Sequence, residues 1–142
     1  MRNQRSDFVV VTANWSTELK ELAETYGALI QRFGESWERG AGGEMADLFV
    51  EDGVFLPGPF DPPLRGREAI REYWKDIPLE QAEISFRYGE IYLAGPWFAT
   101  EIRCTFRRRR KGEIVDILGA LFCETREGKI AEMRLYWHRI TR

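Results

Sequence analysis

The sequence predicts a single α+β domain in which helices come first and an antiparallel sheet follows. Before residue 80, apolar residues recur at intervals of three and four, as on one face of a helix. Beyond it, apolar and polar residues alternate, as in strands with one buried face. This order favours helices packed on one face of a sheet. The 142 residues suffice for one core, so we expect one domain over residues 1–142, with an N-terminal arm over residues 1–15.

The first helix is expected in "STELKELAETYGALIQRFGESWERG", residues 16–40. Ser16 can cap its start, and Glu18 is favourable in the first turn. The glycines that begin at Gly40 end the helix. A single apolar stripe runs along it, formed by Leu19, Leu22, Tyr26, Leu29, Phe33 and Trp37.

Two shorter helices and a loop are expected next. The segment "EMADLFVEDG", residues 44–53, predicts a second helix with Met45, Leu48 and Phe49 facing the core. A brief strand and a stiff proline-rich loop follow in "VFLPGPFDPPLRG". The third helix is expected in "REAIREYWKDI", whose inner side carries Ile70, Tyr73, Trp74 and Ile77.

The remaining sequence predicts strands in the segments 82–95, 96–108, 113–125 and 128–140. The third of them, "EIVDILGALFCET", is apolar on both faces in its middle and so requires cover on both. Helices cover one face, and a second subunit is the simplest cover for the other, so we expect a homodimer.

The two cysteines are expected to be free thiols. A hairpin turn near Arg109–Lys111 would place Cys104 opposite residues near Ile117, and Cys123 would pair further along, near Phe98. This register keeps the two sulfurs too far apart for a disulfide, which needs Cα atoms within about 7 Å.

Composition narrows the classes of partner. A net charge of −2 gives no reason to expect nucleic acid, and the basic run "RRRRKG", residues 107–112, is interpreted as a solvated hairpin tip. No apolar run approaches the roughly 20 residues of a membrane helix, nor the roughly 7–15 of a signal-peptide core, so we expect a cytoplasmic protein. One histidine and two separated cysteines cannot form a structural zinc site, and we expect no metal and no cofactor.

Three strings carry a family resemblance. "FGESWERGAGGEMADLFVEDGVFLPGP", "LRGREAIREYW" and "GKIAEMRLYWHR" resemble the SnoaL-like branch of the nuclear transport factor 2-like superfamily over roughly residues 20–140. The resemblance implies a cone-shaped domain, in which a curved antiparallel sheet carries three helices on its concave face and encloses a pocket. Because this superfamily hosts isomerases, dehydratases, epoxide hydrolases, polyketide cyclases and binding proteins, the resemblance does not choose a function.

The residues at the catalytic positions of the ketosteroid isomerases exclude that branch. Its oxyanion-donating tyrosine is replaced by Phe33, its base falls near Pro57 and its second acid near Ala120. Enolate chemistry needs both a base and a stabilised oxyanion, so steroid-type isomerisation is rejected. The resemblance still implies an apolar, aromatic ligand-binding wall, to which we assign Phe33, Trp37, Trp74, Phe122, Met133, Leu135 and Trp137.

Catalytic candidates come from the polyketide cyclases and limonene-type epoxide hydrolases. Their last strand ends in "R-x-Y-(aromatic)-D", and "RLYWH" puts His138 at the place of that working aspartate. Glu101 and Arg103 resemble the hydrolases' Arg/Asp pair in reversed order. His138 is then either a general acid/base, oriented by Glu101, or a polar strand-end residue, and Glu101 and Arg103 are alternatively an ion pair on the outer face. Strict alternation puts His138 opposite Trp137, so the catalytic role requires a bulge near residues 136–138.

Two functions therefore stay open for a pocket that takes a small apolar or aromatic metabolite. One is a cofactor-free lyase, isomerase or hydrolase in which His138 moves a proton. The other is a binding or accessory protein with the same pocket and no turnover.

Overall fold

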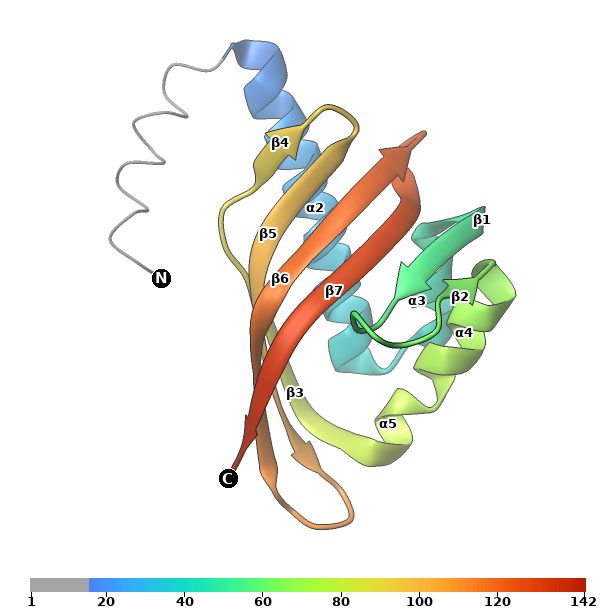
Figure 1. Cartoon of the computed structure of the whole chain (residues 1–142), viewed down its shortest axis with the longest axis vertical. Coiled ribbons are helices and arrows are strands. Elements are labelled where there is room, and N and C mark those ends of the chain that lie inside the picture. The colour runs from blue at the N-terminus through green and yellow to red at the C-terminus, as the bar shows by residue number, and fades with distance from the viewer. Residues whose placement is uncertain (1–15) are drawn as a thin grey trace.

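A curved, unclosed sheet forms one layer of the molecule, and helices pack on the side towards which it curves (Figure 1). The computed structural model describes residues 16–142. The strands are β1 (Phe49–Leu56), β2 (Leu64–Arg65), β3 (Gln81–Tyr88), β4 (Tyr92–Ala94), β5 (Trp97–Arg108), β6 (Ile114–Arg126) and β7 (Lys129–Thr141). Their order is β2-β1-β7-β6-β5-β3, and β4 pairs with β5.

Strand pairing is antiparallel throughout the sheet except between β1 and β7, which run parallel. A parallel pair needs a long crossover connection. Here the whole chain between β1 and β7, which includes two helices and five strands of the sheet, forms that crossover. The α+β class with a curved sheet is confirmed, and the parallel pair is the departure from a purely antiparallel sheet.

The helices are α2 (Thr17–Arg39), α3 (Gly42–Asp47), α4 (Arg67–Lys75) and the single turn α5 (Ile77–Glu80). The predicted start and end of α2 are confirmed. The Ser16 hydroxyl accepts the Leu19 N–H at 3.2 Å, and Gly40 closes the helix in the left-handed conformation, with φ 65°.

The second predicted helix was too long. Helix α3 ends at Asp47, and Phe49 starts a strand because it pairs with Ile130 of β7. Met45 and Phe49 are both buried, so their four-residue spacing resembles a helical stripe although only the first belongs to a helix.

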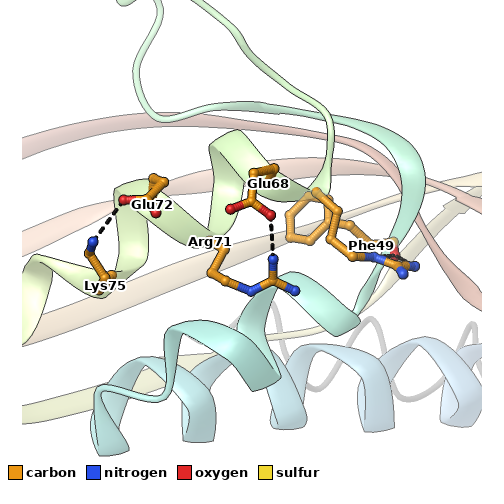
Figure 2. Close-up of polar contacts among 6 residues, drawn as sticks. Phe49, Glu68, Arg71, Glu72 and Lys75 are labelled. Carbon is orange, nitrogen blue, oxygen red and sulfur yellow. Dashed lines mark hydrogen bonds and ion pairs between the residues drawn. The ribbon is translucent and has the colours of Figure 1, made fainter.

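Helix α4 has one exposed face and one face that packs into the core. Two ion pairs lie along it, Glu68–Arg71 at 2.7 Å and Glu72–Lys75 at 2.8 Å (Figure 2). They occupy an exposed face, which leaves Ile70 and Trp74 to pack into the core.

The first residue of α4 ties the helix to the sheet. The guanidinium of Arg67 donates to the carbonyl oxygen of Phe49 at 2.6 Å, so the start of the helix is anchored on β1. This contact fixes the place of Trp74 relative to the sheet.

The predicted register of the β5–β6 hairpin is confirmed, since Cys104 pairs with Ile117 and Cys123 with Phe98. Both cysteines are buried and free. Burial raises the pKa of the Cys104 thiol to about 12 and raises that of Cys123 as well, so both side chains stay protonated near neutrality.

Strand β6 carries apolar side chains on both faces, and among the described residues only the inner face is covered. Leu121 is fully buried beneath the helices, whereas Leu118 and Phe122 are 59% and 44% exposed on the outer face. None of the helices within residues 16–142 is long and apolar enough to cross a membrane.

Candidate functional site

A cavity of about 150 Å³ lies between the inner face of the sheet and the helices. Aromatic side chains from four elements form one wall, namely Trp37 of α2, Phe55 of β1, Tyr73 and Trp74 of α4 and Trp137 of β7. Aliphatic and aromatic side chains of the sheet form the opposite wall, namely Ile102, Phe106, Val115, Ile117 and Leu135.

Trp74 is the centre of the aromatic wall. Its ring centroid lies 5.2 Å from that of Trp37, 5.5 Å from Phe55 and 5.4 Å from Tyr73. Most of these contacts are edge-to-face, the geometry that the aromatic quadrupole favours. A wall of interlocked rings holds its shape, so the cavity is preformed.

Hydrogen bonds orient two of the three indoles that line the cavity. The Trp37 Nε1–H donates to the Gln81 side-chain oxygen at 2.9 Å, and the Trp137 Nε1–H donates to the Pro57 carbonyl at 2.7 Å. The first bond also orients Gln81: its oxygen is occupied, and its amide N–H₂ remains as a donor.

Trp74 differs from the other two indoles. Its Nε1 is buried and has no hydrogen-bond partner among residues 16–142. A buried N–H without a partner costs free energy, of the order of 1–3 kcal/mol.

Two more polar groups reach the cavity. Burial raises the pKa of Tyr73, and the carboxylates of Asp61 and Glu80 raise it further, so its phenol stays protonated at neutral pH. Arg139 lines the cavity as well. The polar side chains that line this cavity thus offer N–H or O–H donors, and within residues 16–142 neither a carboxylate nor an imidazole is among the lining residues.

Four of the predicted ligand-binding residues line the cavity: Trp37, Trp74, Leu135 and Trp137. Phe33 and Met133 do not, because both are fully buried in the packed core behind it. Phe33 packs edge-to-face on Trp74 with the ring centroids 5.7 Å apart, and so supports the wall from behind.

The assignment of Phe122 to the pocket is wrong. It pairs with Arg134 on the outer face of the sheet, and its ring packs edge-to-face on Tyr136 at 5.7 Å. Side chains alternate between the two faces of a strand, so the neighbouring Leu121 and Cys123 point inward and Phe122 cannot.

The prediction that His138 points into the cavity is also wrong. Strands β6 and β7 pair without a shift from Val115–Thr141 to Glu124–Glu132, so the bulge that would turn this side chain inward is not formed. His138 is exposed and lies beside Leu118 on the outer face, whereas Trp137 lies on the inner face.

The other two catalytic candidates share that outer face. Arg103 donates two hydrogen bonds to the Asp116 carboxylate, at 3.1 and 2.7 Å. Glu101 pairs with Ala120, which puts the whole of β6 between it and β7. A strand spacing of nearly 5 Å then separates the backbone of Glu101 from that of β7 by about 10 Å.

His138 instead borders a groove of about 530 Å³ between the loop after β1 and the outer face of β6 and β7. Asp61 and Tyr136 are its other titratable residues. Phe60 and Leu118 supply much of its apolar surface.

Sequence reasoning missed Tyr73 and Gln81 as cavity residues, and it missed Arg139. The signal for Arg139 was available, because a residue two positions after Trp137 faces the same side of the strand. No local signal points to Gln81, whose place depends on the contact between α2 and β3.

The chain belongs to the SnoaL-like domain family, whose profile matches residues 30–133. No curated protein sequence matches it. Among solved structures, a Bacillus subtilis protein assigned as an isomerase is similar with a TM-score of 0.73 and 24% identity, over 81% of this chain and 87% of that one.

Two further structures show the range of proteins with this fold. A Catenulispora acidiphila protein with a ketosteroid isomerase-like fold, solved in complex with trimethylamine, has a TM-score of 0.69 and 16% identity, over 76% of this chain and 83% of that one. The epoxide hydrolase/cyclase-like enzyme SalBIII, which has a role in pyran ring formation in salinomycin, has a TM-score of 0.69 and 20% identity, over 79% and 89%. At these identities the similarity establishes only the fold, so any chemistry must be inferred from the residues of this chain.

Proposed function

We propose that this SnoaL-like protein binds a small apolar or aromatic metabolite in the cavity, as a binding or accessory protein. The observation that carries the proposal is the lining of the cavity, which combines three indoles with hydrogen-bond donors and, over the described part of the chain, includes no carboxylate or imidazole to act as a general base. Such a lining favours a ligand with an aromatic or aliphatic body and an oxygen that accepts hydrogen bonds.

The size of the cavity supports a single ring as the part that enters. An apolar cavity of similar volume in another protein stays dry and binds benzene. The cavity of about 150 Å³ therefore suits a phenyl-sized group.

The lining also argues against proton-transfer chemistry inside the cavity. Lyases and isomerases that abstract a proton need a base within hydrogen-bond reach of the substrate. Donors such as the Tyr73 hydroxyl can stabilise an oxyanion, but they supply only one half of that chemistry.

A cofactor-free lyase, isomerase or hydrolase that uses His138 is the second candidate function. The observation in its favour is the outer groove, where Asp61 and His138 line one hollow. Any such chemistry would take place there and not in the cavity, so His138→Ala would abolish turnover and leave binding in the cavity unchanged.

The homodimer and the cytoplasmic location belong to this proposal as well. The exposed apolar residues of the outer face gather on two adjacent strands: Leu118, Phe122, Tyr136 and Ile140. A second copy of the chain is the partner that we propose for this face.

Filling the cavity tests the binding proposal. Acetophenone, a single ring with one carbonyl, is the probe, and isothermal titration calorimetry measures its affinity. Leu135→Phe adds a ring inside the cavity and should weaken binding about tenfold or more, because the probe and the new ring compete for one volume. Leu118→Phe makes the same change on the outer face and should leave the affinity within about twofold. Equal affinities for both variants would overturn the proposal.

A further inference from the structure

We propose that the cavity and a basic vestibule beside it form one two-part site, and that the ligand carries a carboxylate joined to its apolar ring. This inference rests on the proposed binding function and names the class of ligand. The ring would enter the cavity, and the carboxylate would stay in the vestibule.

The vestibule is a second hollow, of about 430 Å³, that adjoins the cavity. Gln81, Phe106 and Arg139 line both hollows, so the two share a boundary. The vestibule lies at the end of the molecule where the β5–β6 turn and the C-terminus meet (Figure 1). A molecule with a ring in the cavity would extend past Arg139 into this space.

Most of the charged residues that line the vestibule are positive. Four of its lining residues are cationic, Arg108, Arg110, Lys111 and Arg139, against the single carboxylate of Glu80. The chain as a whole carries a net charge of −2, so this positive group stands against the overall balance. A hollow lined by one sign of charge attracts and retains ligands of the other sign.

The cations of the vestibule are available to a ligand. Among the residues that the structure describes, Arg110, Lys111 and Arg139 form no ion pair, and Arg108 has only a loose contact with Glu113 at 3.6 Å. Neighbouring arginines of the same hairpin are engaged instead, since Arg107 pairs with Glu83 at 2.7 Å and Arg109 donates to the Pro78 carbonyl. Some arginines of the hairpin therefore make structural contacts, whereas others line the vestibule.

The donors at the boundary suit a carboxylate. A guanidinium donates two parallel N–H bonds that match the two oxygens of a carboxylate. Arg139 brings that group to the boundary, and the Gln81 amide N–H₂ lies there too, with its oxygen already occupied by Trp37. The boundary therefore offers donors from two sides to one planar anionic group.

The test compares two probes with the same apolar body. Phenylbutyrate carries a carboxylate, phenylbutanol carries a neutral hydroxyl, and titration calorimetry at low ionic strength measures both. We expect the carboxylate to bind about three- to tenfold more tightly than the alcohol. Added salt should weaken binding of the carboxylate and leave binding of the alcohol nearly constant.

Two variants separate the vestibule from a general effect of charge. Arg139→Gln should bring the ratio of the two affinities close to one, because the guanidinium is the group that distinguishes the carboxylate from the alcohol. Arg126→Gln removes the same charge from the end of β6, where this side chain pairs with Asp52, and should keep the preference. The β6–β7 turn that follows lies at the opposite end of the molecule from the β5–β6 turn (Figure 1). Both positions are exposed, and thermal unfolding of each variant checks that the fold is retained.

The outcomes distinguish this inference from the function on which it rests. Equal affinities of the unmodified protein for the two probes, or an unchanged preference in Arg139→Gln, would overturn the carboxylate site and leave the binding function standing. If neither probe binds at millimolar concentration while acetophenone does, the two-part site is wrong. If acetophenone fails as well, the binding function itself is wrong.

Discussion

Asp116 is an acidic residue in the apolar string "IVDILG" of β6, and its side chain is only 8% exposed. Two hydrogen bonds from Arg103 satisfy its carboxylate. They lower the pKa of Asp116, and the positive charges of Arg103, Arg142 and Arg87 act in the same direction against the effect of burial. Arg103, to which sequence reasoning assigned a catalytic role, is thus held in an ion pair with Asp116 on the outer face.

Stability should depend on pH through this carboxylate. Its pKa is lower in the folded than in the unfolded chain, so its contribution is complete above the unfolded value of about 4 and disappears as the pH falls through the folded value. Asp116→Asn should lower the melting temperature by about 2–5 °C at pH 7, and the difference from the unmodified protein should shrink towards pH 3. Thermal unfolding followed by circular dichroism at the two pH values measures it.

Asp52→Asn is the matched control for this prediction. Asp52 is 80% exposed in its pair with Arg126, and exposed pairs contribute little, so the substitution should change the melting temperature at neither pH. A constant difference between Asp116→Asn and the unmodified protein from pH 7 to pH 3 would contradict the account of the charge.

Two kinds of residue-level reasoning gave different results. Alternation along the last strand placed Trp137 inside and His138 outside, as the structure has them. Transfer of pocket positions from the family placed Phe122 and His138 at the pocket, and both lie on the outer face. Alternation of side chains between the two faces is a physical constraint on every strand. A position transferred from a family is less secure, because an alignment error of one residue moves it to the opposite face.

At the scale of elements, the long helix and the long hairpins could be predicted because their signals are local. The cap at Ser16, the stop at Gly40 and the alternation of β5 to β7 lie within the segments themselves. The start of β1 at Phe49 could not be predicted, because it depends on pairing with Ile130, which is far away in the sequence. Long-range pairing decides such short segments.

The outer face of β6 and β7 makes the dimer prediction specific. We expect sedimentation of the unmodified protein at micromolar concentration to give twice the mass of one chain. Phe122→Glu places a charge in the middle of this face and should shift the protein to monomer, because a buried unpaired carboxylate costs several kcal/mol.

Leu19→Glu is the control for the dimer. Leu19 is 42% exposed, close to the 44% of Phe122, but it lies on α2 and not on the sheet. This variant should keep the assembly of the unmodified protein. Sedimentation of the unmodified protein as a single chain would rule out the homodimer.

At the scale of the whole molecule, the aromatic wall of the cavity arises where four elements converge. Trp37, Trp74 and Trp137 come from α2, α4 and β7, and the sequence between them does not show that their rings meet. The sequence could predict an aromatic wall, because the family resemblance named these residues. It could not predict that Gln81 completes the lining, because that depends on the contact between α2 and β3.

The measurement that tests the binding function most directly is the response of the indole N–H signals in a ¹H–¹⁵N spectrum during titration with acetophenone. The Trp74 signal should shift most, because its ring is the centre of the aromatic wall that the bound probe would contact. The Trp97 signal should stay in place, because that ring lies on the outer face, under the Arg134 guanidinium at 5.0 Å. Shifts confined to Trp97 and the backbone of Phe122 and His138, with the Trp74 signal unmoved, would contradict a ligand in the cavity and place binding on the outer face.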